Sequence, residues 1–176
     1  MRSLSFPRLG SAPVQSEIAA AILEICTAKG WRIACAESLT GGLLADAFVS
    51  VPGASRAFAG SLVIYDIRAK EKILGVDGAV LREKGAVEEE VALQMALGAG
   101  KAFAPGPLLL LSTTGVAGPD TDGFKPVGTV CCAALAPGKA PALRTFHFLG
   151  AREKVRLSAV EGALSCALSL LGPSLE

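Results

Sequence analysis

The sequence has a single histidine, His147, and its five cysteines are scattered without a CxxC pair. Protein zinc sites are built from closely spaced Cys and His ligands, so this composition argues against a metal centre. His147 lies in an alternating segment (144–148) typical of a strand, which also argues against a Ser-His-Asp triad. We therefore expect no metal and no cofactor, and reduced, buried thiols in a cytoplasmic protein.

An excess of charge of one sign is also missing, because 17 Lys and Arg face 16 Asp and Glu. Surfaces that bind nucleic acid or acidic lipid need a basic excess, so neither partner is expected. Long hydrophobic runs are absent despite a mean hydropathy of +0.50. The longest aliphatic run is Leu108–Leu111, whereas a membrane-spanning helix needs about 20 apolar residues. Residues 1–15 lack the apolar region of a signal peptide and predict a flexible N-terminal extension.

The sequence does contain helical and strand patterns in alternation, over a length that suits one domain, 16–176. Alternation in the first half predicts parallel crossovers, and three consecutive strands in the second half require at least one antiparallel pair. We predict an α/β fold with a mixed, partly parallel sheet covered by helices. The expected order is a helix capped by Ser16, a strand 31–36, a helix 41–50, a strand 61–65, a helix 67–74, a turn or short helix 76–85, a helix 88–103, strands 108–113, 128–135 and 142–148, and a helix 151–171.

Polar or glycine-rich segments follow three of the predicted strands. The first strand runs into Ser38, Thr40 and two glycines, the second ends at Tyr65 with Lys70 just beyond, and the third is followed by 114–119. In an open α/β sheet, ligands bind beyond the carboxyl ends of the strands. The sequence therefore predicts one crevice surrounded by a serine, a tyrosine, a lysine and a threonine.

Ser38 lies at a strand-to-helix junction, where helix N–H groups stabilise a bound phosphate or a developing oxyanion. Ser38 or Thr40 can also simply cap the helix, and one residue can do both. A serine nucleophile needs a base, and a lysine with a lowered pKa is the candidate that remains. Lys70 has the position for this role, and Lys72 is the solvated alternative on the same helix. An ordinary surface lysine is the competing interpretation of Lys70.

Two further segments are candidates for binding an anion. The loop Gly115–Gly118 lets a backbone approach a ligand closely, although it is not a Walker loop. The following segment, 120–125, is either a lid or a plain surface loop. Arg152, Lys154 and Arg156 gather at the start of the last helix, where cations oppose the helix dipole. They predict either a phosphate site or a solvated charged turn.

The sequence also resembles a known family, the CinA C-terminal domain family, whose members include nicotinamide-nucleotide amidohydrolases. The resemblance covers about residues 16–171 and keeps the family's motifs in order. These motifs are AESLTGG (36–42), the YxxxAK spacing from Tyr65 to Lys70, TGVAGPD (114–120) and KPVGTV (125–130).

The resemblance implies hydrolysis of the carboxamide of nicotinamide mononucleotide to nicotinic acid mononucleotide and ammonia. It places the nucleophile on Ser38, the base on Lys70, an orienting or proton-relaying tyrosine on Tyr65 and the family's threonine on Thr114. Backbone N–H groups near Gly41 and Gly42, or near Thr114, are expected to hold the oxyanion. The full set of expected substrate contacts is Thr40, Gly41, Gly42, Thr114, Gly115, Gly118 and Arg156.

Two positions depart from the family pattern. Ile67 stands where members often carry Asn, and Glu88 where they often carry Ser. These departures motivate a rival hypothesis, a non-catalytic nucleotide- or partner-binding module of the same fold. The alanine-rich helical segments 92–104 and 159–171 also leave more apolar surface than a small domain buries, which predicts a homo-oligomer, with a dimer favoured.

Overall fold

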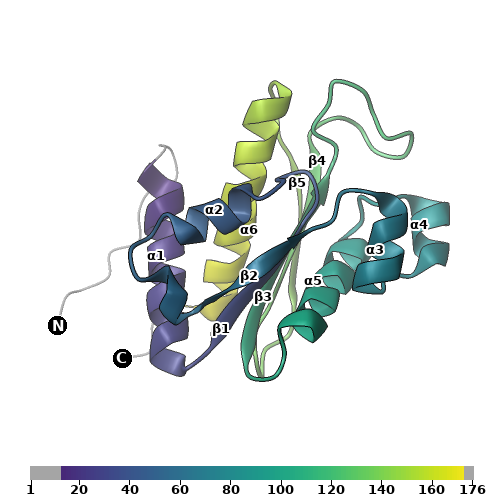
Figure 1. The fold of residues 1–176 in the computed structure, drawn as a ribbon. Coiled ribbons are helices and arrows are strands. Elements are labelled where there is room, and N and C mark those ends of the chain that lie inside the picture. Colours follow the sequence, from purple (N-terminus) through teal and green to yellow (C-terminus); the bar gives the residue numbers. More distant parts are fainter. Residues whose placement is uncertain (1–12, 173–176) are drawn as a thin grey trace.

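The computed structural model describes residues 13–172, which form one layer of sheet between two layers of helices (Figure 1). The elements, in chain order, are α1 (Pro13–Lys29), β1 (Arg32–Glu37), α2 (Leu43–Val49), the 3-10 turn η1 (Ala54–Arg56), β2 (Phe58–Val63), α3 (Ile67–Leu74), α4 (Gly78–Lys84), α5 (Glu89–Phe103), β3 (Leu108–Gly115), β4 (Thr129–Leu135), β5 (Ala142–His147) and α6 (Arg152–Leu171).

The strands form a five-stranded sheet in the order β2-β1-β3-β4-β5. β1 is parallel to both of its neighbours, β2 and β3, whereas β3, β4 and β5 are joined by antiparallel pairing. The predicted α/β fold with a mixed sheet in a single domain is thus confirmed. β1 lies between two parallel strands, so the segments that follow β1 and β2 leave the sheet at the same edge.

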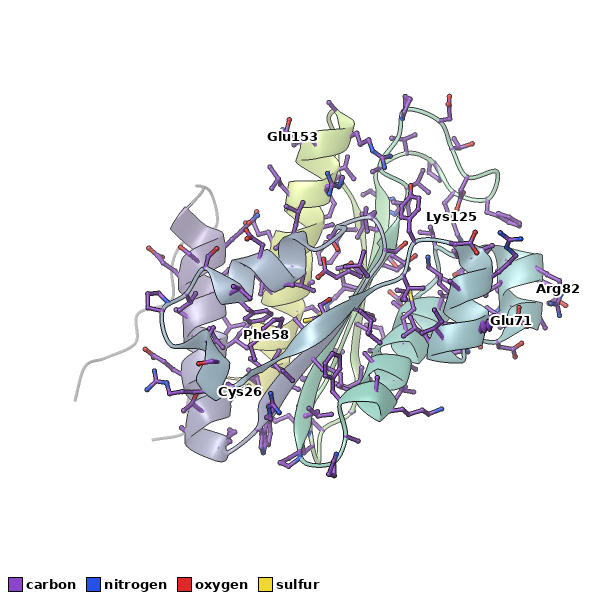
Figure 2. The ribbon with its side chains drawn as sticks, viewed as in Figure 1. Cys26, Phe58, Glu71, Arg82, Lys125 and Glu153 are labelled. Atoms are coloured by element: carbon purple, nitrogen blue, oxygen red, sulfur yellow. The ribbon has the colours of Figure 1, made fainter. Side chains whose placement is uncertain are left out.

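The helices divide between the two faces of the sheet, and each face has its own apolar core (Figure 1). α1, α2 and α6 bury Ile22, Phe48 and Leu164 completely on one face. Phe58, labelled in Figure 2, packs against this core. Its ring stacks on that of Phe48 at a centroid distance of 5.3 Å. α3, α4 and α5 cover the other face, where small side chains such as Ala96 let helix and sheet approach closely.

The N-terminal boundary of the first helix differs from the prediction. α1 begins at Pro13, so Ser16 lies within the helix and is not its N-cap. Proline suits the first position of a helix because its missing N–H would have no acceptor there. Of the extension predicted over residues 1–15, the first twelve residues lie outside the part that the structure describes.

Other boundaries shift for local reasons. Gly41 and Gly42 have φ values of 59° and 100° and form a turn, so α2 starts only at Leu43. β2 starts earlier than predicted, at Phe58, because it pairs along β1 from Ile33 onward. The ambiguous segment 76–85 contains α4. Among the described helices, none has both the length and the apolar character that crossing a bilayer requires.

Candidate active site

Ser38 directly follows β1, at the edge of the sheet where the parallel strands end. Its backbone N–H donates a hydrogen bond to the carbonyl of Thr113 in β3 at 3.0 Å. The residue is 7% exposed. The hydroxyl therefore lies in a protected place that two neighbouring strands fix from the backbone.

Lys70 reaches this hydroxyl from α3. Its Nζ donates to Ser38 Oγ at 3.0 Å and to the carbonyl oxygens of Ile64 and Tyr65, both at 2.9 Å. These three contacts use all the donors of an ammonium group. Lys70 is only 1% exposed. Burial lowers the pKa of Lys70 from 10.5 to about 8, and the charge of Asp66 opposes part of this change.

The start of α3 explains how Lys70 comes to this position. Asp66 is the N-cap, and its carboxylate accepts from the backbone N–H groups of Arg68 at 2.9 Å and Ala69 at 3.2 Å. The cap begins the helix just after β2, so Lys70 falls in the first turns and faces inward. The structure thus brings Ser38 and Lys70 together as a buried pair, and Lys72 lies exposed on the same helix.

Tyr65 lies beside this pair, with its backbone and its side chain in different surroundings. Its backbone carbonyl contacts Lys70, whereas its side chain is 66% exposed. The phenol oxygen accepts from Nη2 of Arg152 at 3.4 Å, and Nη1 of the same arginine donates to the carbonyl of Gly118 at 2.7 Å. Arg152 therefore links the start of α6, the Tyr65 segment and the loop after β3.

Thr114, Gly115 and Gly118 shape the neighbouring segment. The Thr114 hydroxyl, on a residue that is 1% exposed, donates to the carbonyl of Ala86 at 2.7 Å. Gly115 lies in β3, where a Cβ would stand 2.8 Å from the carbonyl oxygen of Thr129. Gly118 has a φ of +89°, a conformation that glycine adopts without strain. These residues join the end of β3 to the segment before α5 and to α6.

The turn after Ser38 is held from two sides. The hydroxyls of Thr40 and Thr113, both fully buried, lie 2.8 Å apart. From α6, Arg156 donates through Nε to the carbonyl of Leu39 at 2.8 Å and through Nη2 to that of Thr40 at 2.9 Å. Thr40 and Arg156 therefore both contact the segment that carries the serine.

Glu37 is the residue of this site that sequence reasoning missed. Its side chain is fully buried, with 0% exposure, directly before Ser38. The available signal was a carboxylate next to a helix start, where the dipole favours negative charge. The carboxylate accepts four hydrogen bonds of 2.8 to 3.0 Å, from the backbone N–H groups of Gly42, Leu44 and Ala45 and from the hydroxyl of Ser61.

This carboxylate changes the expectation for the anion-binding amides. The N–H of Gly42 donates to the carboxylate, and the N–H of Gly41 donates to the carbonyl of Ser38 at 3.2 Å. The expected oxyanion donors at the two glycines are therefore already bonded inside the protein. The amides of Leu39 and Thr40, in contrast, have no acceptor among residues 13–172.

The two positions that depart from the family pattern have clear surroundings. Glu88 forms an ion pair with Lys125, with 2.7 Å between Oε1 and Nζ, and this contact raises the pKa of Lys125. Lys125 thereby connects the loop after β3 to the N-cap residue of α5, on the side of the molecule that carries α3 and α4 (Figure 2). Ile67, the first residue of α3, is 42% exposed.

Within residues 13–172, no three His, Cys, Asp or Glu side chains gather as a metal site.

The fold and the motifs around Ser38 define a member of the CinA superfamily. A solved structure of a CinA superfamily protein from Escherichia coli matches with a TM-score of 0.82 and 30% identity, over 92% of this chain and 93% of that one. The protein CihA from Agrobacterium tumefaciens matches with a TM-score of 0.80 and 33% identity, over 90% and 96%. The family model of the CinA C-terminal domain matches residues 15–171, and the chain belongs to this family.

Two curated relatives place the chain more closely. It is 42% identical over 142 residues to the nicotinamide-nucleotide amidohydrolase PncC of Enterobacter agglomerans, covering 80% of this chain and 85% of that protein. It is 44% identical over 137 residues to a CinA-like protein of Syntrophobacter fumaroxidans, which covers 77% of this chain. The chain spans about a third of the length of that protein and of other CinA-like relatives.

Proposed function

We propose that this protein hydrolyses the carboxamide of nicotinamide mononucleotide to nicotinic acid mononucleotide and ammonia. The observation that carries the proposal is the 3.0 Å hydrogen bond between Ser38 and a buried Lys70 whose pKa is lowered to about 8. A base with such a pKa has a neutral fraction at physiological pH and can accept a proton from the serine. The similarity to a nicotinamide-nucleotide amidohydrolase supports the choice of substrate.

In the first half of the reaction, Ser38 Oγ bonds to the carboxamide carbon while its proton passes to the neutral Nζ of Lys70. The resulting oxyanion accepts hydrogen bonds from the amides of Leu39 and Thr40, which have no acceptor in the described protein. The intermediate then collapses and its C–N bond breaks. The leaving nitrogen takes the proton from Lys70, so ammonia departs and an acyl ester remains on Ser38.

In the second half, a water molecule attacks the ester carbon and gives a proton to Lys70. The bond between the acyl carbon and Ser38 Oγ breaks, Oγ recovers the proton from Lys70, and nicotinic acid mononucleotide is released. The carbonyls of Ile64 and Tyr65 hold Nζ in place through both halves. The exposed phenol of Tyr65 orients the substrate ring from the rim of the site.

The phosphate of the substrate needs a second anion site, because a mononucleotide extends several ångströms from its carboxamide. We place this site at the start of α6, where Arg152 contacts the rim residue Tyr65 and Lys154 is exposed. Arg156 belongs to the same cluster, but two of its nitrogens donate to the turn that carries Ser38. Its contribution to substrate binding therefore acts, at least in part, through that turn.

The test is ammonia release from nicotinamide mononucleotide by the pure protein. We expect Ser38→Ala and Lys70→Met to lower the rate at least a thousandfold, since each removes half of the pair. Lys72→Met, on the same helix but exposed, is the matched control and retains the rate of the unaltered protein. Activity that survives in both Ser38→Ala and Lys70→Met would contradict the mechanism.

The second candidate is a non-catalytic module that binds the nucleotide or a partner. The observation that favours it is the ion pair between Glu88 and Lys125, because this pair neutralises the lysine of the loop after β3 that could otherwise bind an anionic substrate. Tight binding of the mononucleotide without ammonia release identifies this alternative. We also propose a cytoplasmic homo-oligomer, with a dimer favoured, and light scattering at micromolar concentration tests the assembly.

A further inference from the structure

Glu37 is a fully buried carboxylate whose partners are all neutral. Each of its two oxygens accepts two hydrogen bonds, Oε2 from Gly42 and Leu44 and Oε1 from Ala45 and Ser61. The ion pairs among residues 13–172 do not include it. A buried charge without a counter-ion is costly unless hydrogen bonds satisfy it fully. Here the chain meets that requirement by wrapping the start of α2 around the carboxylate.

The backbone of the same residue reaches the other half of the catalytic pair. The carbonyl of Glu37 accepts from the N–H of Ile64 at 2.8 Å, and the carbonyl of Ile64 accepts from Nζ of Lys70 at 2.9 Å. The side chain, through Ser61, also bonds to β2, the strand that leads into this segment. One residue thus fixes the strand end that carries Ser38 to the segment that holds the base.

The carboxylate also fixes the segment that follows Ser38. Residues 38–42 form a turn whose closing end, the N–H of Gly42, is bonded to the Glu37 side chain. Ser38 is therefore enclosed between two points that Glu37 holds, its own backbone and the start of α2. A displacement of either point moves Oγ relative to Nζ of Lys70, and misplacement of reacting groups by about 1 Å can lower a rate about a hundredfold.

We propose that Glu37 is a positioning residue, whose carboxylate holds Ser38 at hydrogen-bond distance from Lys70 and withdraws the α2 amides from the reacting carbonyl. The inference rests on the proposed function where it is tested by turnover of nicotinamide mononucleotide. Its other test, the reactivity of Ser38 toward a chemical probe, does not require that the substrate be known.

The experiment replaces Glu37 by glutamine, which has the same size but turns an N–H donor toward groups that are themselves donors. The chemical readout is the rate at which a fluorophosphonate probe labels Ser38, in which Oγ bonds to phosphorus, fluoride leaves and Lys70 takes the proton. We expect labelling of the native fraction to slow ten- to a hundredfold. With nicotinamide mononucleotide, we expect kcat per folded molecule to fall by a similar factor and KM to stay within twofold. The folded fraction, measured by circular dichroism, separates this fall from partial unfolding, which lowers only the number of active molecules.

Two further variants make the result specific. Ser61→Ala removes one of the four hydrogen bonds, and we expect a two- to fivefold slowing of labelling. Asp77→Asn alters the N-cap of α4, which accepts from the N–H of Ala79, and it leaves labelling unchanged. If Glu37→Gln does not fold, Ser61→Ala decides the question.

Labelling rates within 1.5-fold of the unaltered protein in every folded variant overturn the inference. A protein that is labelled at Ser38 but releases no ammonia from the mononucleotide overturns the proposed function alone. The two failures are therefore distinguishable.

Discussion

Burying Lys70 has a cost in folding stability that depends on pH. Lys70 is 1% exposed, and burial lowers its pKa from 10.5 to about 8. Between these two values the unfolded chain binds more protons than the folded one, so this group makes the protein more stable as pH rises. The full penalty is present below pH 8 and vanishes as pH approaches 10.5. The difference between 10.5 and about 8 corresponds to about 3 kcal/mol.

Lys70→Met removes the titrating group while keeping a long side chain in the same place. Two effects on the free energy of unfolding are expected at pH 7. Removing the buried amine stabilises the variant by an amount that depends on pH, and losing the three hydrogen bonds of Nζ destabilises it by an amount that does not. The pH-dependent part is the quantity that tests the reasoning. The free energy of unfolding of Lys70→Met, relative to that of the unaltered protein, is expected to fall by about 2 to 3 kcal/mol between pH 7 and pH 10.

The assay is urea unfolding followed by far-UV circular dichroism at pH 7, 8, 9 and 10, with Lys72→Met as the exposed control. Cysteine thiols of the unfolded chain also lose protons in this range, whereas in the folded protein burial raises the pKa of Cys26 to about 12 and that of Cys35 well above its ordinary value. Their raised values make the fold less stable as pH rises above about 9, but the effect is common to all three proteins and cancels in the difference. A difference between Lys70→Met and the unaltered protein that is constant from pH 7 to 10 would refute the lowered pKa.

Three other predictions follow from named contacts. Asp66→Asn keeps a cap oxygen for α3 but removes the charge that opposes the pKa change of Lys70, so the rise of the ammonia-release rate with pH is expected to shift to lower pH; an unchanged profile contradicts this. Gly98→Ala places a Cβ against the carbonyl of Leu74, where α5 meets α3, and is expected to destabilise the fold by about 2 kcal/mol in urea unfolding. Arg156→Ala frees the Leu39 and Thr40 carbonyls, and we expect an equal loss of kcat/KM on nicotinamide mononucleotide and on its phosphate-free riboside. A loss confined to the phosphorylated substrate would instead assign Arg156 to the phosphate.

Some features of this protein follow from the sequence alone because they depend on neighbours along the chain. Alternating apolar residues and the glycine and proline breaks predict strands and helices, and their order requires a mixed sheet. The polar segments after the strands of Ser38 and Tyr65 predict a site at one edge, because parallel strands end together. The first residues of α1 and α2, Pro13 and Leu43, differ from the predicted ones, because several nearby residues can supply the geometry that begins a helix.

The tertiary structure decided the state of each group at that site, because burial and partners come from distant parts of the chain. Lys70 and Ser38 are 32 residues apart, and only packing determines that the lysine is buried with a lowered pKa and not solvated like Lys72. Arg156 donates to the carbonyl of Leu39, 117 positions away in the sequence. The sequence predicted that this arginine binds the substrate, whereas in the structure it holds the turn that follows Ser38. Three of the hydrogen bonds of the Glu37 carboxylate come from residues close in sequence, but the fourth, from Ser61, exists only because β2 pairs beside β1.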